Sequence, residues 1–463
     1  MMKLKKIPAI LLAALMVVSL LGGCVSSYVD KTTEAPAPQT TEAPKPTEGT
    51  SAEPGTTEAP APATEADISG TKLVVWYAVS GTSGDLFNKL SEKFAKETGV
   101  ELELSYSGGS GDTATKVSAA LLTQTQPDVA LMYAGPLYTG GEGDFRIADL
   151  LKTTNDFDQA DVFEGMMDYC DYMNEGFCAI PCGISTQVMY YNKDILKAAG
   201  VDMTNPPKTW AEFYDVLGKV MEKGNTSGAE GFKAFDTNDE AWLFKSMLMQ
   251  NGCEIIENDN GEITPIFNNE KAVEVGDYWK SLVDAGYMSA AQHSNAEKAF
   301  LGGNLAFIAA SSNRISRWTA DSVPFELGAI EMPYFTQPSL ALGGNVLVIL
   351  TKDESKLQAA WKYVTYLTNA ENNTEFALGT GYLPIHKSAM ERKDVKDAIA
   401  ANEMYTVAFN QLSYTWAYTH FQEMGTMDTQ IKSALGKLEK GRGTSQEVLD
   451  KAVKEVQDEI NDK

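Results

Sequence analysis

The chain has 463 residues, of which 43% are apolar and 22% charged, and its formal net charge at pH 7 is −25. This composition is typical of a soluble globular protein, and the length allows two domains of ordinary size. The acidic balance argues against nucleic acid and anionic membranes as partners, because both repel a negative surface. It does not exclude an anionic small molecule as a ligand, because one arginine or helix N-terminus close to the ligand outweighs the repulsion from distant negative charges.

Residues 1–23 have the pattern of a secretion signal. Lysines near the start precede a short apolar run at Ile7–Leu21, which is too short for a confident membrane span. Leu21–Cys24 reads Leu-Gly-Gly-Cys and resembles the bacterial lipobox, which implies cleavage before Cys24 and diacylation of that residue. Because acyl chains gain about 0.8 kcal/mol per buried methylene, lipid alone would hold the body at the outer face of the cell membrane. The alternative is an ordinary cleaved signal with an incidental cysteine.

Residues 24–68 form a segment rich in Thr, Pro, Glu and Ala. It has almost no large apolar side chain and therefore cannot bury a core. Its prolines favour an extended conformation of roughly 3 Å per residue, so the segment could reach on the order of 100 Å. A stalk that crosses a cell wall and a linker without a length requirement both fit this composition.

The first part of the body alternates strand and helix patterns. The apolar run Lys72–Val79 predicts a buried strand, and apolar residues at helical spacing follow it until Gly99. Alternation at Glu101–Tyr106 predicts a second strand, an amphipathic helix follows at Asp112–Gln124, and Asp128–Tyr133 predicts a third strand. Such βαβ units predict a parallel sheet covered on both faces.

The same alternation continues to the end of the chain. Strands are expected at Thr186–Asp194, Leu301–Ser311 and Gly343–Leu350, and helices at Thr209–Lys223, within Phe267–Gly286, through Trp361 and Leu367, and after Thr444. The helices that start at Thr209 and Thr444 each open with a capping box, because a Glu follows three residues later. No long flexible linker divides the body, so we expect two α/β lobes connected by several chain crossings.

Four cysteines besides Cys24 lie in the body. A hairpin that turns at Asn174–Gly176 would bring Cys170 near Cys178, and the other two cysteines of the body are Cys182 and Cys253. A disulfide formed outside the cell, a zinc site and buried thiols are the three alternatives. The spacing matches no common zinc pattern and no histidine is near, but the sequence does not decide between the other two.

Catalytic signals are sparse. The three histidines, His293, His386 and His420, are widely separated, and no nucleotide-binding, metalloprotease or nucleophile-elbow motif occurs. We therefore expect a binding protein that is not an enzyme and that has no cofactor and no metal. A two-carboxylate glycosidase remains as an alternative, because carboxylates are plentiful.

Aromatic, hydroxyl and glycine residues gather where predicted strands end or begin. Ligands of open α/β sheets bind beyond the carboxyl ends of strands. Aromatic faces suit a sugar ring, and hydroxyls, amides and backbone N–H groups suit its hydroxyls. The candidate ligand-binding residues are Tyr77, Ser80, Gly81, Tyr133, Ser185, Asn238, Asp239, Trp242, Ser312, Arg314, Gly344, Asn345, Tyr382, Trp416 and Tyr418.

The tryptophans divide into two groups. Trp210, Trp279 and Trp361 lie on apolar faces of predicted helices and are expected in the core. Trp242 and Trp416 are candidate platforms for a sugar, although Trp242 fits a core position equally well. Replacement by alanine would distinguish the two roles, because a cleft residue affects affinity and a core residue affects stability.

Several segments together resemble one family. These are "GFCAIPCGISTQVMYYNKDILKAAGVDMTNPPKTWAEF", "FNNEKAVE", "EKAFLGGNLAFIAASS", "GGNVLVI" and "GTGYLPIHKSA". They resemble family 1 extracellular solute-binding proteins, the substrate-binding lipoproteins of bacterial ABC importers, and within them the glycerol-3-phosphate and carbohydrate binders. The resemblance covers the whole chain after the linker.

The resemblance implies a type II periplasmic-binding-protein-like α/β fold. Its two lobes would be joined by hinge crossings, trap a ligand between them and dock as a monomer onto membrane permease subunits. We expect lobe 1 at 69–186 and 331–380, and lobe 2 at 187–330 and 381–463 with the C-terminal helices.

The resemblance also implies ligand positions at Ser80, Ser185, Ser312, Gly344 and Tyr382. The glycerol-phosphate binders carry an arginine near Tyr414–Met424, but this stretch contains neither Arg nor Lys here. Phosphate requires charge-assisted donors, so the expected ligand is a mono- or oligosaccharide. The alternative ligand is glycerol-3-phosphate or a phosphodiester, with Arg314 in place of the missing arginine.

Overall fold

The computed structural model describes residues 67–134, 146–172, 176–226, 228–318, 322–417 and 420–462. The predicted signal segment, the linker and Cys24 lie outside these ranges. Over the described ranges, no helix is both long enough and apolar enough to cross a membrane.

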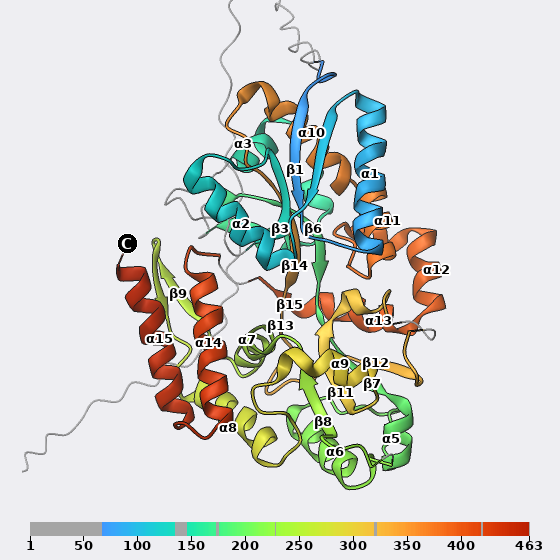
Figure 1. Cartoon of the computed structure of the whole chain (residues 1–463), viewed down its shortest axis with the longest axis vertical. Coiled ribbons are helices and arrows are strands. Elements are labelled where there is room, and N and C mark those ends of the chain that lie inside the picture. The colour runs from blue at the N-terminus through green and yellow to red at the C-terminus, as the bar shows by residue number, and fades with distance from the viewer. Residues whose placement is uncertain are drawn as a thin grey trace, which may run out of the picture. The chain divides into compact units, whose positions relative to one another are not determined.

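The first sheet contains five strands in the order β2-β1-β3-β14-β6 (Figure 1). Their bounds are β1 Lys72–Tyr77, β2 Glu101–Tyr106, β3 Val129–Tyr133, β6 Ile180–Ser185 and β14 Gly343–Ile349. Strand β1 runs parallel to β2 and β3, as the βαβ pattern predicts. Strand β14 runs antiparallel to β3 and β6, so the sheet is mixed.

Helices cover both faces of this sheet. They are α1 Thr82–Thr98, α2 Ser110–Thr123, α3 Arg146–Thr153, α4 Glu164–Asp168, α10 Glu354–Thr368 and α11 Ala370–Thr380. On β3, Val129 and Leu131 pack in one apolar cluster with Phe87 of α1, whereas Ala130 and Met132 pack in the other. The continuous apolar strand therefore has both of its faces buried, as expected for a covered sheet.

The second sheet contains four strands in the order β12-β7-β11-β8. Their bounds are β7 Gln187–Asn192, β8 Lys233–Thr237, β11 Leu305–Ser311 and β12 Leu327–Ile330. Strand β11 is parallel to β8 and antiparallel to β7. The two separate sheets with their helices confirm the expected two-lobed α/β fold.

The helices after residue 192 are α5 Lys193–Ala199, α6 Trp210–Lys223, α7 Glu240–Gln250, α8 Glu270–Asp284, α9 Ala296–Leu301, α12 Lys393–Ala401, α13 Glu403–Asn410, α14 Met424–Glu439 and α15 Ser445–Asn461. Both predicted capping boxes are present, since Thr209 and Thr444 each accept from the backbone N–H three residues later. Trp210, Trp279 and Trp361 are buried, as expected.

Short elements complete the structure. The strands are β4 Asp171–Tyr172, β5 Gly176–Phe177, β9 Ile256–Asp259, β10 Glu262–Pro265, β13 Leu340–Ala341 and β15 Thr415–Trp416, and the 3-10 helices are η1 Gln159–Asp161, η2 His293–Asn295, η3 Ser312–Arg314, η4 Lys387–Glu391 and η5 Gln411–Tyr414. Antiparallel pairing of β4 with β5 confirms the predicted hairpin. It brings the N–H of Cys178 to 3.0 Å from the carbonyl oxygen of Cys170.

Cys170, Cys178, Cys182 and Cys253 are all buried and form no disulfide in the structure. Burial raises the pKa of the Cys182 thiol to about 12 and that of Cys253 to about 11. Of the alternatives drawn from the sequence, buried thiols describe these side chains. Within the described ranges, no group of three His, Cys, Asp or Glu residues is arranged to hold a metal ion.

The chain passes between the sheets at Thr186, which separates β6 from β7, and again between β12 and β14. All strands of the first sheet fall within the ranges expected for lobe 1, and all strands of the second within those expected for lobe 2. After α11, the N–H of Leu383 bonds to the carbonyl of Ile184 in β6. The full extent of each lobe remains a prediction.

Candidate ligand-binding cleft

A cavity of about 380 Å³ lies where strands of both sheets meet. Strands β3, β6 and β11 end at it with Tyr133, Ser185 and Ser311, and β14 begins at it with Gly343. The lining residues are Ser110, Gly111, Tyr133, Ser185, Asp239, Trp242, Lys245, Ser311, Asn313, Gly343, Gly344, Tyr382, Asp428 and Lys432. The cavity is therefore built by both lobes, at the strand ends where a ligand was expected.

Six candidate residues from the sequence come together in this cavity: Tyr133, Ser185, Asp239, Trp242, Gly344 and Tyr382. Eight others do not line it: Tyr77, Ser80, Gly81, Asn238, Ser312, Arg314, Asn345 and Trp416. Tyr418 lies outside the described residues.

Three candidates lie at the end of β1 and in the turn before α1. Tyr77 stacks on Phe87 with 5.0 Å between ring centroids, and its hydroxyl accepts from Asn88. Ser80 and Gly81 are exposed, and Gly81 has φ 57° as the residue that precedes α1. These residues shape the strand-to-helix turn.

Ser312 and Asn345 lie directly behind lining residues. The Asn345 amide donates to the hydroxyl of Tyr382 at 3.1 Å. Ser312 is fully buried, and its backbone N–H donates to the carbonyl of Thr186. Among the described residues, the Ser312 hydroxyl and the Asn345 side-chain oxygen have no hydrogen-bond partner.

Arg314 does not line the cavity but contacts Asn313, the preceding residue, which does. Its guanidinium donates to Glu297 through Nε at 3.2 Å and Nη2 at 2.7 Å, and to the Asn313 side-chain oxygen at 2.7 Å. It thus positions Asn313, which lines the cavity. The suggestion that Arg314 replaces a phosphate-binding arginine is not favoured by this arrangement, since Glu297 already occupies its bidentate face.

Asn238 and Trp416 lie outside the cleft, the first at a second cavity and the second in a short two-stranded sheet. Asn238 lines a separate cavity of about 540 Å³ together with His293 and residues of α14. Trp416 belongs to β15, where it pairs in parallel with Ala341 of β13.

Trp242 combines the two roles that the sequence left open. It lines the cavity, and its indole N–H donates to the carbonyl of Ala341 at 2.9 Å. Its ring packs so closely against Gly343 that a Cβ atom at residue 343 would lie 2.8 Å from a ring carbon. The side chain of Asp239 caps α7 by accepting from the N–H of Trp242 at 3.3 Å, which fixes the first turn of the helix.

Gly344 allows close contact between β14 and β6. Its φ is 122°, and a Cβ atom there would lie 2.1 Å from the carbonyl oxygen of Gly183. No side chain fits this position, so a bare backbone faces the cavity.

Three charged lining residues were missed by the sequence analysis. The Lys245 ammonium of α7 donates to the Asp428 carboxylate of α14 at 2.6 Å, although the Lys245 side chain is only 2% exposed. Lys432, one turn after Asp428, lies 3.7 Å from the carboxylate of Asp239. Lys245 follows Trp242 by three residues and lies on the same helix face, so the spacing alone could have placed Lys245 beside the candidate Trp242. Nothing in the sequence associates α14 with α7.

The charged groups of the cavity all lie on one of its sides, and their positive and negative charges are equal in number. The lining residues from the first sheet and its helices carry no formal charge, whereas α7 and α14 supply two carboxylates and two ammonium groups. Burial raises the pKa of Asp239, and the ammonium of Lys432 opposes that rise. The arrangement offers hydroxyls, rings and paired charges without a net charge.

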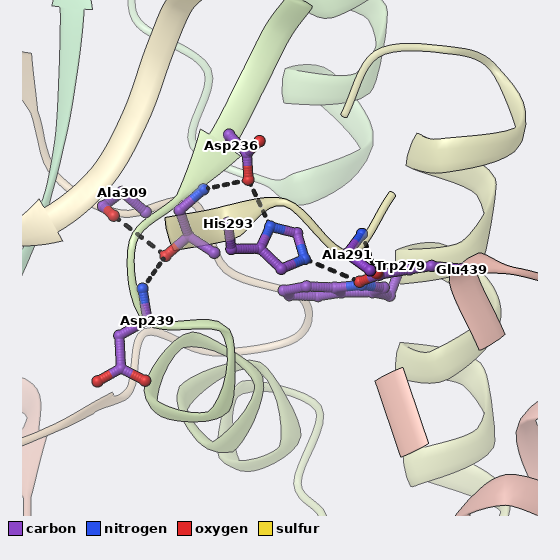
Figure 2. Close-up of polar contacts among 8 residues, drawn as sticks. Asp236, Asp239, Trp279, Ala291, His293, Ala309 and Glu439 are labelled. Atoms are coloured by element: carbon purple, nitrogen blue, oxygen red, sulfur yellow. Dashed lines mark hydrogen bonds and ion pairs between the residues drawn. The ribbon is translucent and has the colours of Figure 1, made fainter. Parts of the chain in front are cut away.

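A buried ion-pair network holds α14 against β8. Figure 2 shows His293 between Asp236 of β8 and Glu439 of α14. Its Nδ1 and Nε2 lie 2.6 and 2.9 Å from the two carboxylates, and the indole N–H of Trp279 also donates to Glu439. Burial lowers the pKa of His293, but the hydrogen bonds and charges of both carboxylates outweigh it and raise the pKa to about 10. At neutral pH an imidazolium therefore joins the two elements.

A family model of bacterial extracellular solute-binding proteins matches residues 89–403. The match spans most of the chain, and the chain belongs to this family of solute-binding proteins.

Similar proteins include the sn-glycerol-3-phosphate-binding periplasmic protein UgpB of Salmonella typhimurium, which is 28% identical over 305 residues, 62% of this chain and 67% of UgpB. The cyclic α-maltosyl-1,6-maltose binding protein of Arthrobacter globiformis has a similar structure, with a TM-score of 0.70, 22% identity and coverage of 83% and 98% of the two chains. UgpB of Mycobacterium tuberculosis in complex with glycerophosphocholine gives a TM-score of 0.73, 23% identity and coverage of 85% and 99%.

Proposed function

We propose that this solute-binding protein captures a mono- or oligosaccharide in the cleft and delivers it to the permease subunits of an ABC importer. The observation that carries the proposal is the composition of the cavity: rings of Tyr133, Trp242 and Tyr382, hydroxyls of several serines, and the bare backbone of Gly343 and Gly344. Rings bind the apolar face of a pyranose, and the polar groups match its hydroxyls.

Hinge closure is the proposed mechanism. Because both lobes line the cavity, a ligand that contacts both favours the closed arrangement over the open one. The permease would then recognise the closed arrangement. A lipid on Cys24 would keep the protein, as a monomer, at the outer face of the membrane and raise its concentration near the importer.

A phosphate ester is the second candidate ligand. Two observations favour it: Lys245 and Lys432 line the cavity, and UgpB relatives are named for sn-glycerol-3-phosphate. Against it, each ammonium already has a carboxylate partner in the cavity, Asp428 for Lys245 and Asp239 for Lys432. A phosphate dianion would have to approach these carboxylates, whereas a neutral sugar would not.

Calorimetric titration with maltose, maltotriose, sn-glycerol-3-phosphate and glycerophosphocholine tests both candidates. We expect saturable binding of a saccharide and no products after long incubation. Saturation by the phosphate esters alone would establish the second candidate. Accumulation of a cleaved saccharide, abolished by one Asp or Glu substitution in the cleft, would instead identify a glycosidase.

A further inference from the structure

The second cavity, of about 540 Å³, is adjacent to the cleft. One wall is formed by α14 and the turn after it, and the other by the residues that lead into α7 and by the segment 291–294. Lys432 of α14 lines both cavities. Asn238 and Glu240 line the second cavity, directly before and after Asp239, which lines the cleft. The two cavities are therefore neighbours.

The second cavity collects positive charge in a chain whose net charge is −25. Two carboxylates line it, against four cations: Lys432, Lys437, Lys440 and Arg442. Lys432 has Asp239 as a partner at 3.7 Å. Within the part of the chain that the structure describes, the other three cations form no ion pair and their side chains donate no hydrogen bond. These donors are available to an anionic ligand, and charge-assisted hydrogen bonds to carboxylate or phosphate are the strong ones.

Glu439, one of the two carboxylates, is already occupied by the protein. One of its oxygens accepts from Trp279 at 2.7 Å and lies 2.9 Å from Nε2 of His293, and the other accepts from the N–H of Ala291 at 2.6 Å (Figure 2). Its side chain is only 1% exposed. These bonds also join the segment 291–294 to α14, so the two walls are held in place before a ligand arrives.

Gly436 keeps the wall of α14 open between two of the cations. Lys432, Gly436 and Lys440 follow each other at intervals of four residues and therefore lie on one face of the helix. A Cβ atom at residue 436 would have no atom within 4 Å, so no neighbour requires the glycine. Glycine inside a helix is less stable than alanine. Packing does not account for Gly436, whereas a ligand lying between the two ammonium groups does.

Compensation of the helix dipole is the alternative reason for these cations. The C-terminal end of a helix attracts positive side chains, and Lys437 lies in the last turn of α14. This effect does not account for Lys432, which lies about two turns before the helix ends, because the dipole acts only within the last turn. It does not account for the open space at Gly436 either.

We infer that the second cavity binds the carboxylate or phosphate group of an acidic saccharide whose sugar rings occupy the cleft. Lys437, Lys440 and Arg442 donate to the acidic group, and Lys432 lies where the two cavities meet. This inference rests on the proposed function, since it names the class of saccharide that the cleft takes. A neutral saccharide binds through the cleft alone, and its acidic counterpart gains the contacts of the second cavity.

Calorimetric titration of the full chain with matched pairs of saccharides tests the inference. Maltose is compared with maltose 6′-phosphate and cellobiose with cellobiouronate, because the members of each pair differ in one acidic group. Inorganic phosphate serves as the free anion. We expect the acidic member to bind about tenfold more tightly at low ionic strength, and the difference to shrink as salt screens the charges. Equal affinities within each pair would overturn the inference and leave the proposed function standing.

Two substitutions in the second cavity show where the acidic group binds. Lys437→Gln removes one unpaired charge, and Gly436→Gln places a side chain in the open space. Each should reduce the preference for the acidic member about fivefold and leave the affinity for the neutral member unchanged, because neither residue lines the cleft. Lys219→Gln is the matched control, since Lys219 is an exposed cation of α6 that lines neither cavity. It should preserve the preference.

Thermal unfolding separates an effect on binding from an effect on folding. Because glutamine is a good helix former and a Cβ atom at residue 436 meets no neighbour, Gly436→Gln should not lower the unfolding midpoint. A preference for acidic saccharides that survives both substitutions would refute the second cavity as the site.

The free anion separates this inference from the proposed function. Phosphate binding that both substitutions abolish, without any preference within the saccharide pairs, would assign the cavity to a free anion and refute its link to the cleft. If no saccharide binds while phosphate binding depends on Gly436 and Lys437, the proposed function fails and the anion site stands. Absence of binding by every probe would refute both.

Discussion

At the scale of single residues, the charged side chains of the cleft separate the two candidate ligands. Lys432 is suited to this test, because its side chain is 47% exposed and its replacement should affect stability little. We expect Lys432→Gln to leave the affinity for a saccharide within about threefold, since a neutral ligand does not require the ammonium charge. Affinities are measured by calorimetric titration.

The control for this prediction is Lys440→Gln. Lys440 is an exposed cation that follows the same helix and does not line the cleft. If Lys432→Gln weakens binding of sn-glycerol-3-phosphate more than about tenfold while Lys440→Gln does not, the cleft recognises phosphate and the saccharide proposal is wrong.

His293 makes stability depend on pH above neutrality. Its pKa rises from 6.5 to about 10 on folding, so the folded state binds the proton more tightly than the unfolded state. Its stabilising contribution is therefore complete below pH 6.5 and is lost as the pH rises to about 10. The difference in unfolding free energy between the unsubstituted chain and His293→Gln should shrink over this interval, measured by urea denaturation.

His420→Gln provides the opposite control. Burial, together with the charge of Lys245, lowers the pKa of His420 to about 3, so its ring is neutral in the folded state. Above pH 6.5 it is neutral in the unfolded state as well, and the effect of His420→Gln should not vary with pH there. A pH-independent effect of His293→Gln would contradict the charged network in Figure 2.

At the scale of helices and strands, local sequence signals were sufficient to locate individual elements but not to determine how distant strands pair. Apolar runs predicted β1 and β3, and capping boxes predicted the starts of α6 and α15. The antiparallel direction of β14 was not predicted, because it depends on pairing with β3 and β6 far away in sequence. Pairing between strands that are far apart in the chain leaves no pattern in the local sequence.

The pairing of β14 with β6 makes Gly344 irreplaceable. Gly344→Ala would force a Cβ atom into the Gly183 carbonyl at a φ of 122°, so we expect a loss of several kcal/mol in unfolding free energy. Gly436→Ala is the matched substitution, because a Cβ atom at this position of α14 would have no atom within 4 Å. It should stabilise the chain by about 0.5–1 kcal/mol. Thermal and urea unfolding measure both, and equal effects would contradict the close approach at Gly344.

At the scale of the whole molecule, the sequence predicted two lobes and six of the lining residues. It missed Lys245, Asp428 and Lys432, because α7 and α14 are separated by most of the second half of the chain. It also included Ser80 and Arg314, whose residue types suit a ligand but whose neighbours in the structure are the turn into α1 and Glu297. Residue type alone does not tell a lining position from a supporting one.

The proposed lipid anchoring of the molecule depends on Cys24. If Cys24 carries the lipid, Cys24→Ser should move the protein from the membrane fraction to the medium or soluble extract, because no acyl chain is then attached. Fractionation followed by immunoblotting measures the shift. Cys182→Ser, a change at a buried thiol of the body, should leave the protein in the membrane fraction. Retention of the Cys24→Ser protein at the membrane would contradict lipid anchoring.

The contact between the indole of Trp242 and the bare backbone at Gly343 makes these two positions a single unit of substitution. A larger residue at 343 becomes tolerable only when the ring at 242 is reduced, so a double replacement should be less harmful than the sum of its single changes. Attempts to redesign the cavity for a different ligand would therefore have to vary Trp242 and the first residue of β14, Gly343, together.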